Sequence, residues 1–214
     1  MELQHPLAIV TPTLDGDVLR VLAGADSEFT PPEVWRLIDE YSEDGVRKSL
    51  QRLVDQGIVL QRRAGHAWLY RLNRDHVGAA AVIALAGLRE EVLRRITARV
   101  DHWPVQAAYV ALFGSAARGE MRAASDIDLF VVRRDAVDPL DDAWATQLSE
   151  LSQDGHRWTG NDTRVLEYSE AEVREGIELG DPVLVSIRDE GIWLSGVVGL
   201  LGRRVRVRVG AGVS

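Results

Sequence analysis

Two aspartates separated by one residue have the type and spacing of a metal-binding pair. Asp126 and Asp128 lie near the start of the segment 125–132, whose apolar residues predict a β-strand. Because side chains alternate along a strand, the two carboxylates should project to one side, roughly 6–7 Å apart along the chain. Two like charges this close repel unless a cation lies between them. Carboxylate oxygens suit Mg²⁺, which takes its remaining ligands from water and phosphates.

A turn with the composition of a phosphate-binding turn precedes these acids. Residues 109–113 are apolar and predict a buried strand, which ends at the pair Gly114-Ser115. Glycine lets the backbone turn sharply, and residues 116–118 predict the start of a helix, where backbone amides favour an anionic phosphate. A phosphate-binding turn on one strand and a metal-binding pair on the next are the two halves of a nucleotidyl-transfer site.

These residues carry a resemblance. Gly114-Ser115, the tripeptide at 117–119 and the pentapeptide at 125–129 resemble the signature of the DNA polymerase β-type nucleotidyltransferase superfamily, above all its minimal branch, which has GSxARG…SDIDL with this gap. The resemblance implies an α/β (α+β) domain with a mixed sheet flanked by helices. It also implies two Mg²⁺ ions and a nucleoside triphosphate, ATP first of all. It assigns the nucleotide to Gly114, Ser115, Arg118 and Ser125, and the metal to Asp126 and Asp128. A pair of solvated surface acids is the alternative.

Members of this superfamily place a third carboxylate on a neighbouring strand, where it completes the metal site and helps to deprotonate the attacking hydroxyl. Residues 163–168 predict such a strand. Glu167 is the candidate within it, and Asp162 is the second candidate. An ordinary exposed strand glutamate is the alternative. The expected catalytic acids are Asp126, Asp128 and Glu167.

The composition excludes other kinds of chemistry. The 214 residues include no cysteine, which excludes disulfides, thiolate zinc sites and thiol nucleophiles. The first residues do not have the pattern of a signal peptide, and the most apolar run, 77–88, is too short to span a bilayer. Gly114–Gly119 lacks the Lys-Ser/Thr of an ATPase phosphate loop. We therefore expect a cytoplasmic protein with no membrane partner.

The net charge of −8 is distributed unevenly along the chain. Residues 1–45 contain two arginines and ten acids, whereas residues 46–74 contain seven basic residues and one acid. Charge segregated this sharply over adjacent segments indicates an interaction with nucleic acid, whatever the total charge.

The first 76 residues resemble a winged helix-turn-helix. Helices are expected at 15–22, from Thr30 to Ile38 and at 42–54, followed by two strands around the turn 64–66. The resemblance implies that the third helix reads double-stranded DNA and that the hairpin contacts phosphates or a minor groove. The residues so assigned are Arg47, Lys48, Gln51, Arg52, Arg62, Arg63 and His66. A winged helix that contacts only proteins is the alternative.

We predict a winged-helix domain at residues 1–76, a small-residue connector at 77–84 and a nucleotidyltransferase domain at 85–214. An amphipathic helix should run from Leu85 to Trp103 and cover the sheet, a dimerising helix in a homodimer being the alternative. Residues 138–154 predict another helix. Residues 203–209 alternate apolar and basic, which predicts an edge strand with solvated arginines or a surface for nucleic acid.

The sequence therefore predicts an Mg²⁺-dependent nucleotidyltransferase with a DNA-binding domain. It would transfer a nucleoside monophosphate, AMP first of all, to a hydroxyl of a protein, an RNA such as a tRNA end, or a small molecule. One alternative is a transcriptional regulator that senses nucleotide without catalysis. Another follows from a resemblance to toxin–antitoxin nucleotidyltransferases, which modify a partner and repress their own operon.

Overall fold

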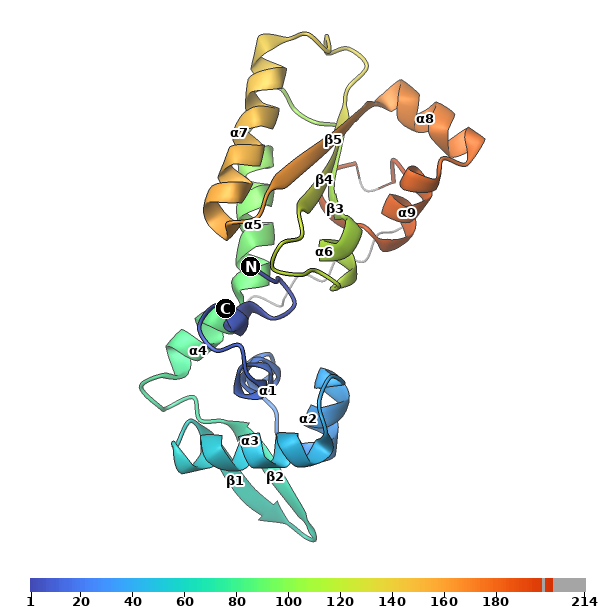
Figure 1. Ribbon diagram of the computed structural model, residues 1–214. Helices are drawn as coiled ribbons and strands as arrows, with labels where there is room; N and C mark the ends of the chain where they lie inside the picture. The colour runs from blue at the N-terminus through green and yellow to red at the C-terminus, as the bar shows by residue number, and fades with distance from the viewer. Residues whose placement is uncertain (198, 202–214) are drawn as a thin grey trace. The chain divides into compact units, whose positions relative to one another are not determined.

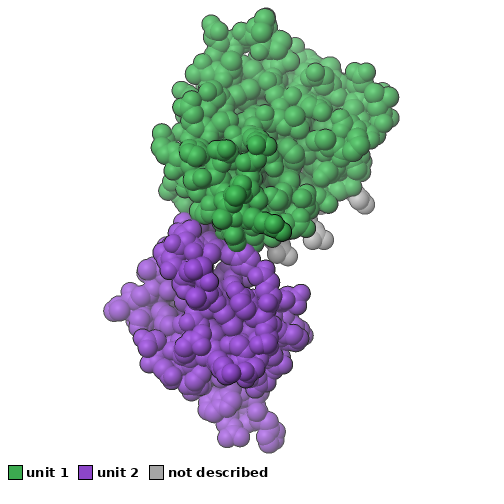
Figure 2. All heavy atoms as spheres, in the orientation of Figure 1, with its two compact units in different colours: residues 1–4, 90–214 green, residues 5–89 purple. Residues whose placement is uncertain are grey.

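The computed structural model describes residues 1–197 and 199–201, which form two compact units (Figure 2). One unit is residues 5–89, and the other joins residues 1–4 to the described residues from 90 onward. The strand expected at 203–209 lies outside the described residues. No helix among the described residues combines the length and the apolar character needed to cross a bilayer.

The unit of residues 5–89 contains helices followed by a hairpin. Its elements are η1 (Pro6–Ile9), α1 (Leu14–Ala23), α2 (Pro31–Ile38), α3 (Glu43–Asp55), β1 (Val59–Ala64), β2 (Ala67–Leu72) and α4 (Ala79–Ala86). Thr30 and Glu33 form a capping box at the start of α2, and Ser42 caps α3 by accepting a hydrogen bond from the Gly45 amide at 3.1 Å. The strands pair antiparallel. The predicted helices and hairpin are therefore present.

The expected connector at residues 77–84 differs from the structure. Helix α4 begins at Ala79, and its apolar side chains pack into the core of the unit of residues 5–89. A segment composed almost entirely of alanine, valine, isoleucine and leucine gains more by burying this surface than by linking two domains in water.

The other unit is built on a mixed sheet (Figure 1). Its elements are α5 (Leu88–Asp101), β3 (Tyr109–Phe113), α6 (Gly114–Arg118), β4 (Ile127–Arg133), α7 (Asp142–Thr159), β5 (Thr163–Ser169), α8 (Glu170–Leu179), α9 (Pro182–Glu190) and β6 (Ile192–Gly196). Among the described residues the strand order is β5-β4-β3-β6, in which β4 and β5 are parallel and the other pairs antiparallel.

Helices cover both faces of this sheet (Figure 1). On one face Ile127, Leu129 and Val131 of β4 pack with residues of α5 and α7. On the other face Phe130 and Val132 pack with residues of α8 and α9. The fold is thus the predicted mixed α+β class, and α5 covers the sheet as expected. Both faces are buried, and alternation along the strand decides which face each β4 side chain joins.

Candidate functional site

The turn after β3 lies directly against the second acid of the pair. Phe113, the last residue of β3, is in register with Asp128 of β4. Gly114 has a φ of +69°, and a Cβ at this position would lie 2.6 Å from Oδ2 of Asp128. Only glycine allows this backbone conformation and this approach without strain. The predicted turn therefore places the backbone of Gly114 beside a carboxylate.

Helix α6 is too short to favour phosphate binding through its dipole. It contains five residues, Gly114–Arg118, and ends at Gly119 in the left-handed conformation. A helix this short has little macrodipole, so the groups that remain for phosphate binding are the turn itself, the Ser115 hydroxyl and the Arg118 guanidinium. Arg118 donates from Nε to Glu120 at 2.8 Å and from Nη1 to Glu190 of α9 at 3.3 Å.

The two aspartates lie close enough to interact electrostatically. The strand β4 begins at Ile127, so Asp126 ends the preceding loop and Asp128 is the second strand residue. Asp128 lies on the face that carries Phe130. Burial raises the pKa of the Asp128 carboxyl above its ordinary value, the charge of Asp126 raises it further, and the charges of Arg164 and Arg118 oppose the rise. Burial and the neighbouring acid therefore disfavour the ionised form of Asp128, and the two arginines only oppose this effect.

Arg164 supplies much of that opposing effect. It is in register with Asp128 in the parallel pair β4–β5, and its Nη1 lies 2.9 Å from Oδ2 of Asp126. The Arg164 side chain is 71% exposed, so the ion pair is open to solvent on one side. Arg164 was not among the residues predicted from the sequence, because the family resemblance implies a carboxylate on this strand.

Glu167 does not join the pair. It is in register with Val131, whose side chain points to the α5–α7 face, so Glu167 lies on the opposite face of the sheet from Asp128. Its Oε1 accepts hydrogen bonds from Nε of Arg133 at 2.8 Å and from the indole of Trp144 at 2.9 Å. These contacts hold the carboxylate away from the aspartates. The prediction that Glu167 completes the metal site is corrected by this register.

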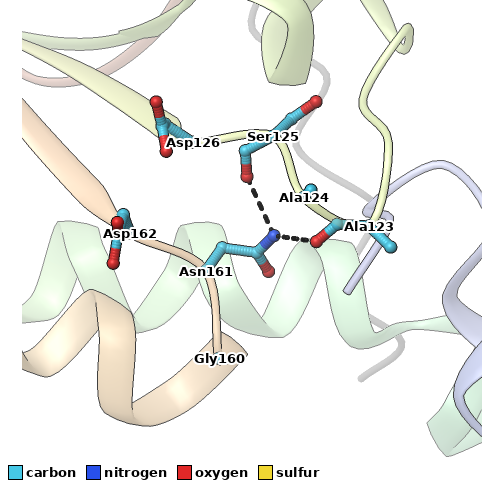
Figure 3. Close-up of a pocket in the computed structure, with 7 residues that line it drawn as sticks. All are labelled: Ala123, Ala124, Ser125, Asp126, Gly160, Asn161 and Asp162. Carbon is cyan, nitrogen blue, oxygen red and sulfur yellow. Dashed lines mark hydrogen bonds between the residues drawn. The ribbon is translucent and has the colours of Figure 1, made fainter.

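Asp162 lies closer to the pair than Glu167 does. Together with Asp126 it lines a polar pocket of about 170 Å³, whose other residues are Ala123, Ala124, Ser125, Gly160 and Asn161 (Figure 3). The Asp162 carboxylate lies 3.5 Å from Nδ1 of His156 on α7. Within the described residues no three histidine or acidic side chains converge as metal ligands. Neither candidate therefore forms a three-carboxylate site with the aspartates.

The loop before β4 is held by a buried asparagine. Asn161 donates hydrogen bonds to the carbonyl oxygens of Ala123 at 3.0 Å and Ser125 at 2.9 Å (Figure 3). The Ser125 hydroxyl accepts a hydrogen bond from the Arg122 amide at 2.9 Å, so this predicted nucleotide contact also closes its own turn. These bonds fix the loop whose last residue is Asp126.

The first four residues support the same loop. The Met1 amine donates to the Thr159 carbonyl at 3.2 Å and to Oδ1 of Asn161, and burial lowers its pKa. The Glu2 carboxylate accepts from the Ala123 amide at 3.1 Å, and Leu3 is buried in the core. No sequence pattern in residues 1–4 indicated this role.

The residues predicted to contact DNA are exposed on α3 and the β1–β2 hairpin, and most already have acidic partners. On α3, Arg47 pairs with Glu43 and Lys48 with Asp44. The full set of exposed residues is Arg47, Lys48, Gln51, Arg52, Arg62, Arg63 and His66. Arg52 pairs with Asp15 of α1, Arg62 pairs with Glu28, Gln51 donates to Asp55, and Arg63 donates to the Gly65 carbonyl. The charges that are segregated along the sequence are therefore paired in space.

Part of the chain is similar to known proteins. Residues 93–194 match the family model of the nucleotidyltransferase domain. No curated protein matches the chain. One similar solved structure is a toxin–antitoxin with AMP-PNP, with 23% identity and a TM-score of 0.33 over 50% of this chain and 73% of that one. Another is a mutant of the toxin–antitoxin MntA-HpeT, with 20% identity and a TM-score of 0.34 over 49% of this chain and 73% of that one. Residues 93–194, which include β3, α6, β4 and β5, match a nucleotidyltransferase domain, and this match supports the assignment of the chain as a nucleotidyltransferase enzyme.

Proposed function

We propose that the enzyme transfers a nucleoside monophosphate, AMP in the first instance, from a nucleoside triphosphate to a hydroxyl acceptor at the turn and acid pair of β3–β4. The observation that carries the proposal is the contact between Gly114 and Asp128, within a domain that matches nucleotidyltransferases. This contact puts a turn suited to phosphate next to a carboxylate suited to a metal ion.

The acid pair fits Mg²⁺ by the chemistry of its donors. Asp126 and Asp128 offer hard oxygen ligands, and a bound cation would offset the burial and the neighbouring charge that together raise the pKa of Asp128. A bound Mg²⁺ supplies neutralisation of the phosphate charge and activation of the acceptor hydroxyl. Two carboxylates provide ligands for one ion. The second ion expected from the sequence would have to share them, because Glu167 lies on the other face.

The remaining residues position the triphosphate. The missing side chain at Gly114 lets the Asp128 carboxylate approach the turn, and Ser115 offers a hydroxyl donor to a phosphate. Arg118 is exposed, and its ion pairs with Glu120 and Glu190 cost little to open, so its guanidinium can turn to a phosphate. The acceptor hydroxyl gives its proton to water, its oxygen attacks the α-phosphorus, and pyrophosphate leaves with the electrons of the broken P–O bond.

The acceptor classes to test are a protein hydroxyl, an RNA end and a small molecule. The direct experiment incubates α-labelled ATP, GTP, CTP and UTP with Mg²⁺, lysate of the native source and the purified enzyme. We expect labelled product with the natural sequence and none with Asp126→Ala plus Asp128→Ala. The matched control replaces two exposed acids of α8, Glu175→Ala plus Glu178→Ala, and should retain transfer.

Nucleotide binding without transfer would instead support the alternative of a nucleotide-sensing regulator. A labelled protein that is encoded beside this chain would support the resemblance to toxin–antitoxin nucleotidyltransferases. Loss of binding in the control as well as in the double variant would contradict the assignment of the site.

We also propose that the unit of residues 5–89 is a winged helix-turn-helix that binds double-stranded DNA through α3 and its hairpin. The observation that favours this function is the exposure of basic side chains on these two elements. The unit as a whole has eleven acids and ten basic residues, so net charge does not drive the binding. Exposed ion pairs such as Arg47–Glu43 contribute roughly 0–1 kcal/mol, so DNA phosphates can replace the carboxylates.

A further inference from the structure

Arg164 lies beside the acid pair on β5, the strand on which the family resemblance implied a third acid. The parallel register places Arg164 beside Asp128, and strand alternation puts both on the face that carries Phe130 and Leu166. The next residue of β5 on that face, Leu166, is apolar. The strand β5 thus presents a cation, not a carboxylate, to the acid pair.

This cation already has one of the acids as its partner. Nη1 of Arg164 lies 2.9 Å from Oδ2 of Asp126, whose side chain is 26% exposed. A metal ion bound by the pair would compete with the guanidinium for the same oxygen. Arginine stays charged at every physiological pH, so it leaves the carboxylate only by moving. The movement costs little, because the Arg164 side chain is 71% exposed and such pairs are weak.

A displaced guanidinium remains next to the site. Its planar array of donors matches phosphate oxygens, which makes arginine well suited to bind a triphosphate. Since Gly114 brings the phosphate-binding turn against Asp128, and Arg164 is in register with Asp128, a bound triphosphate would lie within reach of the freed side chain.

We propose that Arg164 is an exchangeable counter-ion of this site. It neutralises Asp126 when no nucleotide is bound, and it moves to the triphosphate when the metal and nucleotide bind. The inference rests on the proposed function, and it assigns to a protein side chain part of the positive charge that a second metal ion would otherwise supply.

The test measures binding without turnover. Isothermal titration would give the affinity for Mg²⁺ alone and the affinity for a non-hydrolysable ATP analogue in the presence of saturating Mg²⁺. With Arg164→Ala we expect Mg²⁺ alone to bind more tightly, by up to about fivefold, because a competitor of exposed-pair strength is removed. We expect the analogue to bind at least about tenfold more weakly, because a charge-assisted hydrogen bond is lost. Opposite changes in the two affinities are specific to an exchangeable counter-ion.

Three further variants sharpen this test. Arg164→Gln, which is also neutral, should reproduce both changes and serves if the alanine variant fails to fold. Arg164→Lys keeps the charge, so it should retain the affinity for Mg²⁺ while restoring only part of the affinity for the analogue. Arg174→Ala removes another exposed arginine, paired with Asp135 in the same unit, and should change neither affinity.

Any result in which Arg164→Ala fails to move the two affinities in opposite directions overturns the inference. Asp126→Ala and Asp128→Ala separate this failure from failure of the proposed site. If they abolish Mg²⁺ binding while Arg164→Ala changes nothing, the site stands and the role of Arg164 does not. If they leave Mg²⁺ and analogue binding unchanged, the site itself is wrong.

Discussion

The backbone of Gly114 lies against the carboxylate of Asp128, so closely that a methyl group at residue 114 would be 2.6 Å from Oδ2. The contact joins the two halves of the site, the turn after β3 and the acid pair at the start of β4. The register Phe113–Asp128 of the antiparallel pair produces it. A substitution at residue 114 should therefore disturb phosphate and metal binding together.

Gly114→Ala should reduce affinity for a non-hydrolysable ATP analogue with Mg²⁺ by at least about tenfold, and should lower the free energy of unfolding by about 1–3 kcal/mol because φ is +69°. Gly119→Ala is the matched control. Its φ is +76°, but no described atom lies within 4 Å of the added Cβ. It should lose stability and keep its affinity. Equal losses of affinity in both variants would show that strain, and not the contact with Asp128, is responsible.

Glu167→Gln should leave nucleotidyl transfer within about twofold of the natural enzyme, since the side chain lies on the face opposite Asp128. The substitution should instead destabilise the fold, because Arg133 loses a charged partner at 2.8 Å. We expect a decrease of about 1–3 kcal/mol in the free energy of unfolding, measured in urea. Asp126→Asn is the comparison and should abolish transfer. A folded Glu167→Gln variant without activity would restore Glu167 to the catalytic set.

The position of Glu167 shows which feature of the site could not be predicted from the sequence. The strand from Thr163 was predicted correctly, but the side to which each residue points was not. Both faces of the sheet are buried, so β5 has no clean alternation of polar and apolar residues from which its register could be read. The glycine-serine turn and the acid pair were easier to predict from the sequence, because their chemistry depends on local spacing alone.

Two other features depend on tertiary contacts and could not be predicted from the sequence. The hydrogen bond of the Met1 amine to Asn161 joins residues 160 positions apart, and neither residue belongs to a recognisable motif. The charge segregation between residues 1–45 and 46–74 suggested an unopposed basic surface. The fold instead pairs Arg52 with Asp15 and Arg62 with Glu28, both from the acidic segment.

Asp128→Asn should raise thermal stability at neutral pH. Burial and Asp126 raise the pKa of Asp128 in the folded state, so the ionised form is disfavoured there relative to the unfolded chain. The natural protein therefore loses folding stability as pH rises through the folded pKa, and this loss vanishes below the ordinary pKa of 3.8. At pH 7 the melting temperature of the variant should exceed that of the natural protein by about 2–4 °C for each kcal/mol gained in the free energy of unfolding. The two melting temperatures should converge toward pH 4.

The control for that titration is Asp135→Asn, which should have the opposite sign. Hydrogen bonds from Arg174 and the Ala171 amide lower the pKa of Asp135, so its carboxylate contributes stability above the ordinary pKa and loses it as pH falls through the folded pKa. This variant should melt below the natural protein at pH 7. Added Mg²⁺ should stabilise the natural protein and Asp135→Asn but not Asp128→Asn.

Asn161→Ala should weaken the loop that ends at Asp126. Its side chain is 3% exposed and bonds two carbonyl oxygens, so truncation should cost about 1–3 kcal/mol in the free energy of unfolding. Analogue affinity should fall as well, because the loop carries Ser125 and Asp126. Asn161→Asp keeps an acceptor for the Met1 amine but loses the donor to the loop. If it binds the analogue normally, the bond to Met1, and not the bonds to the loop, matters for nucleotide binding.

Removing acids from α3 should strengthen DNA binding. Glu43 and Asp44 pair with Arg47 and Lys48, so Glu43→Gln plus Asp44→Asn frees two cations for phosphates. We expect higher affinity for duplex DNA and, by contrast, lower affinity and a shallower salt dependence with Arg47→Ala plus Arg52→Ala. The exposed pair of Arg94 with Glu91 on α5 provides the control, because Glu91→Gln should leave DNA affinity unchanged. If neither double variant changes DNA affinity or its salt slope, α3 is not the DNA-contacting helix, and a protein partner for this unit becomes the better explanation.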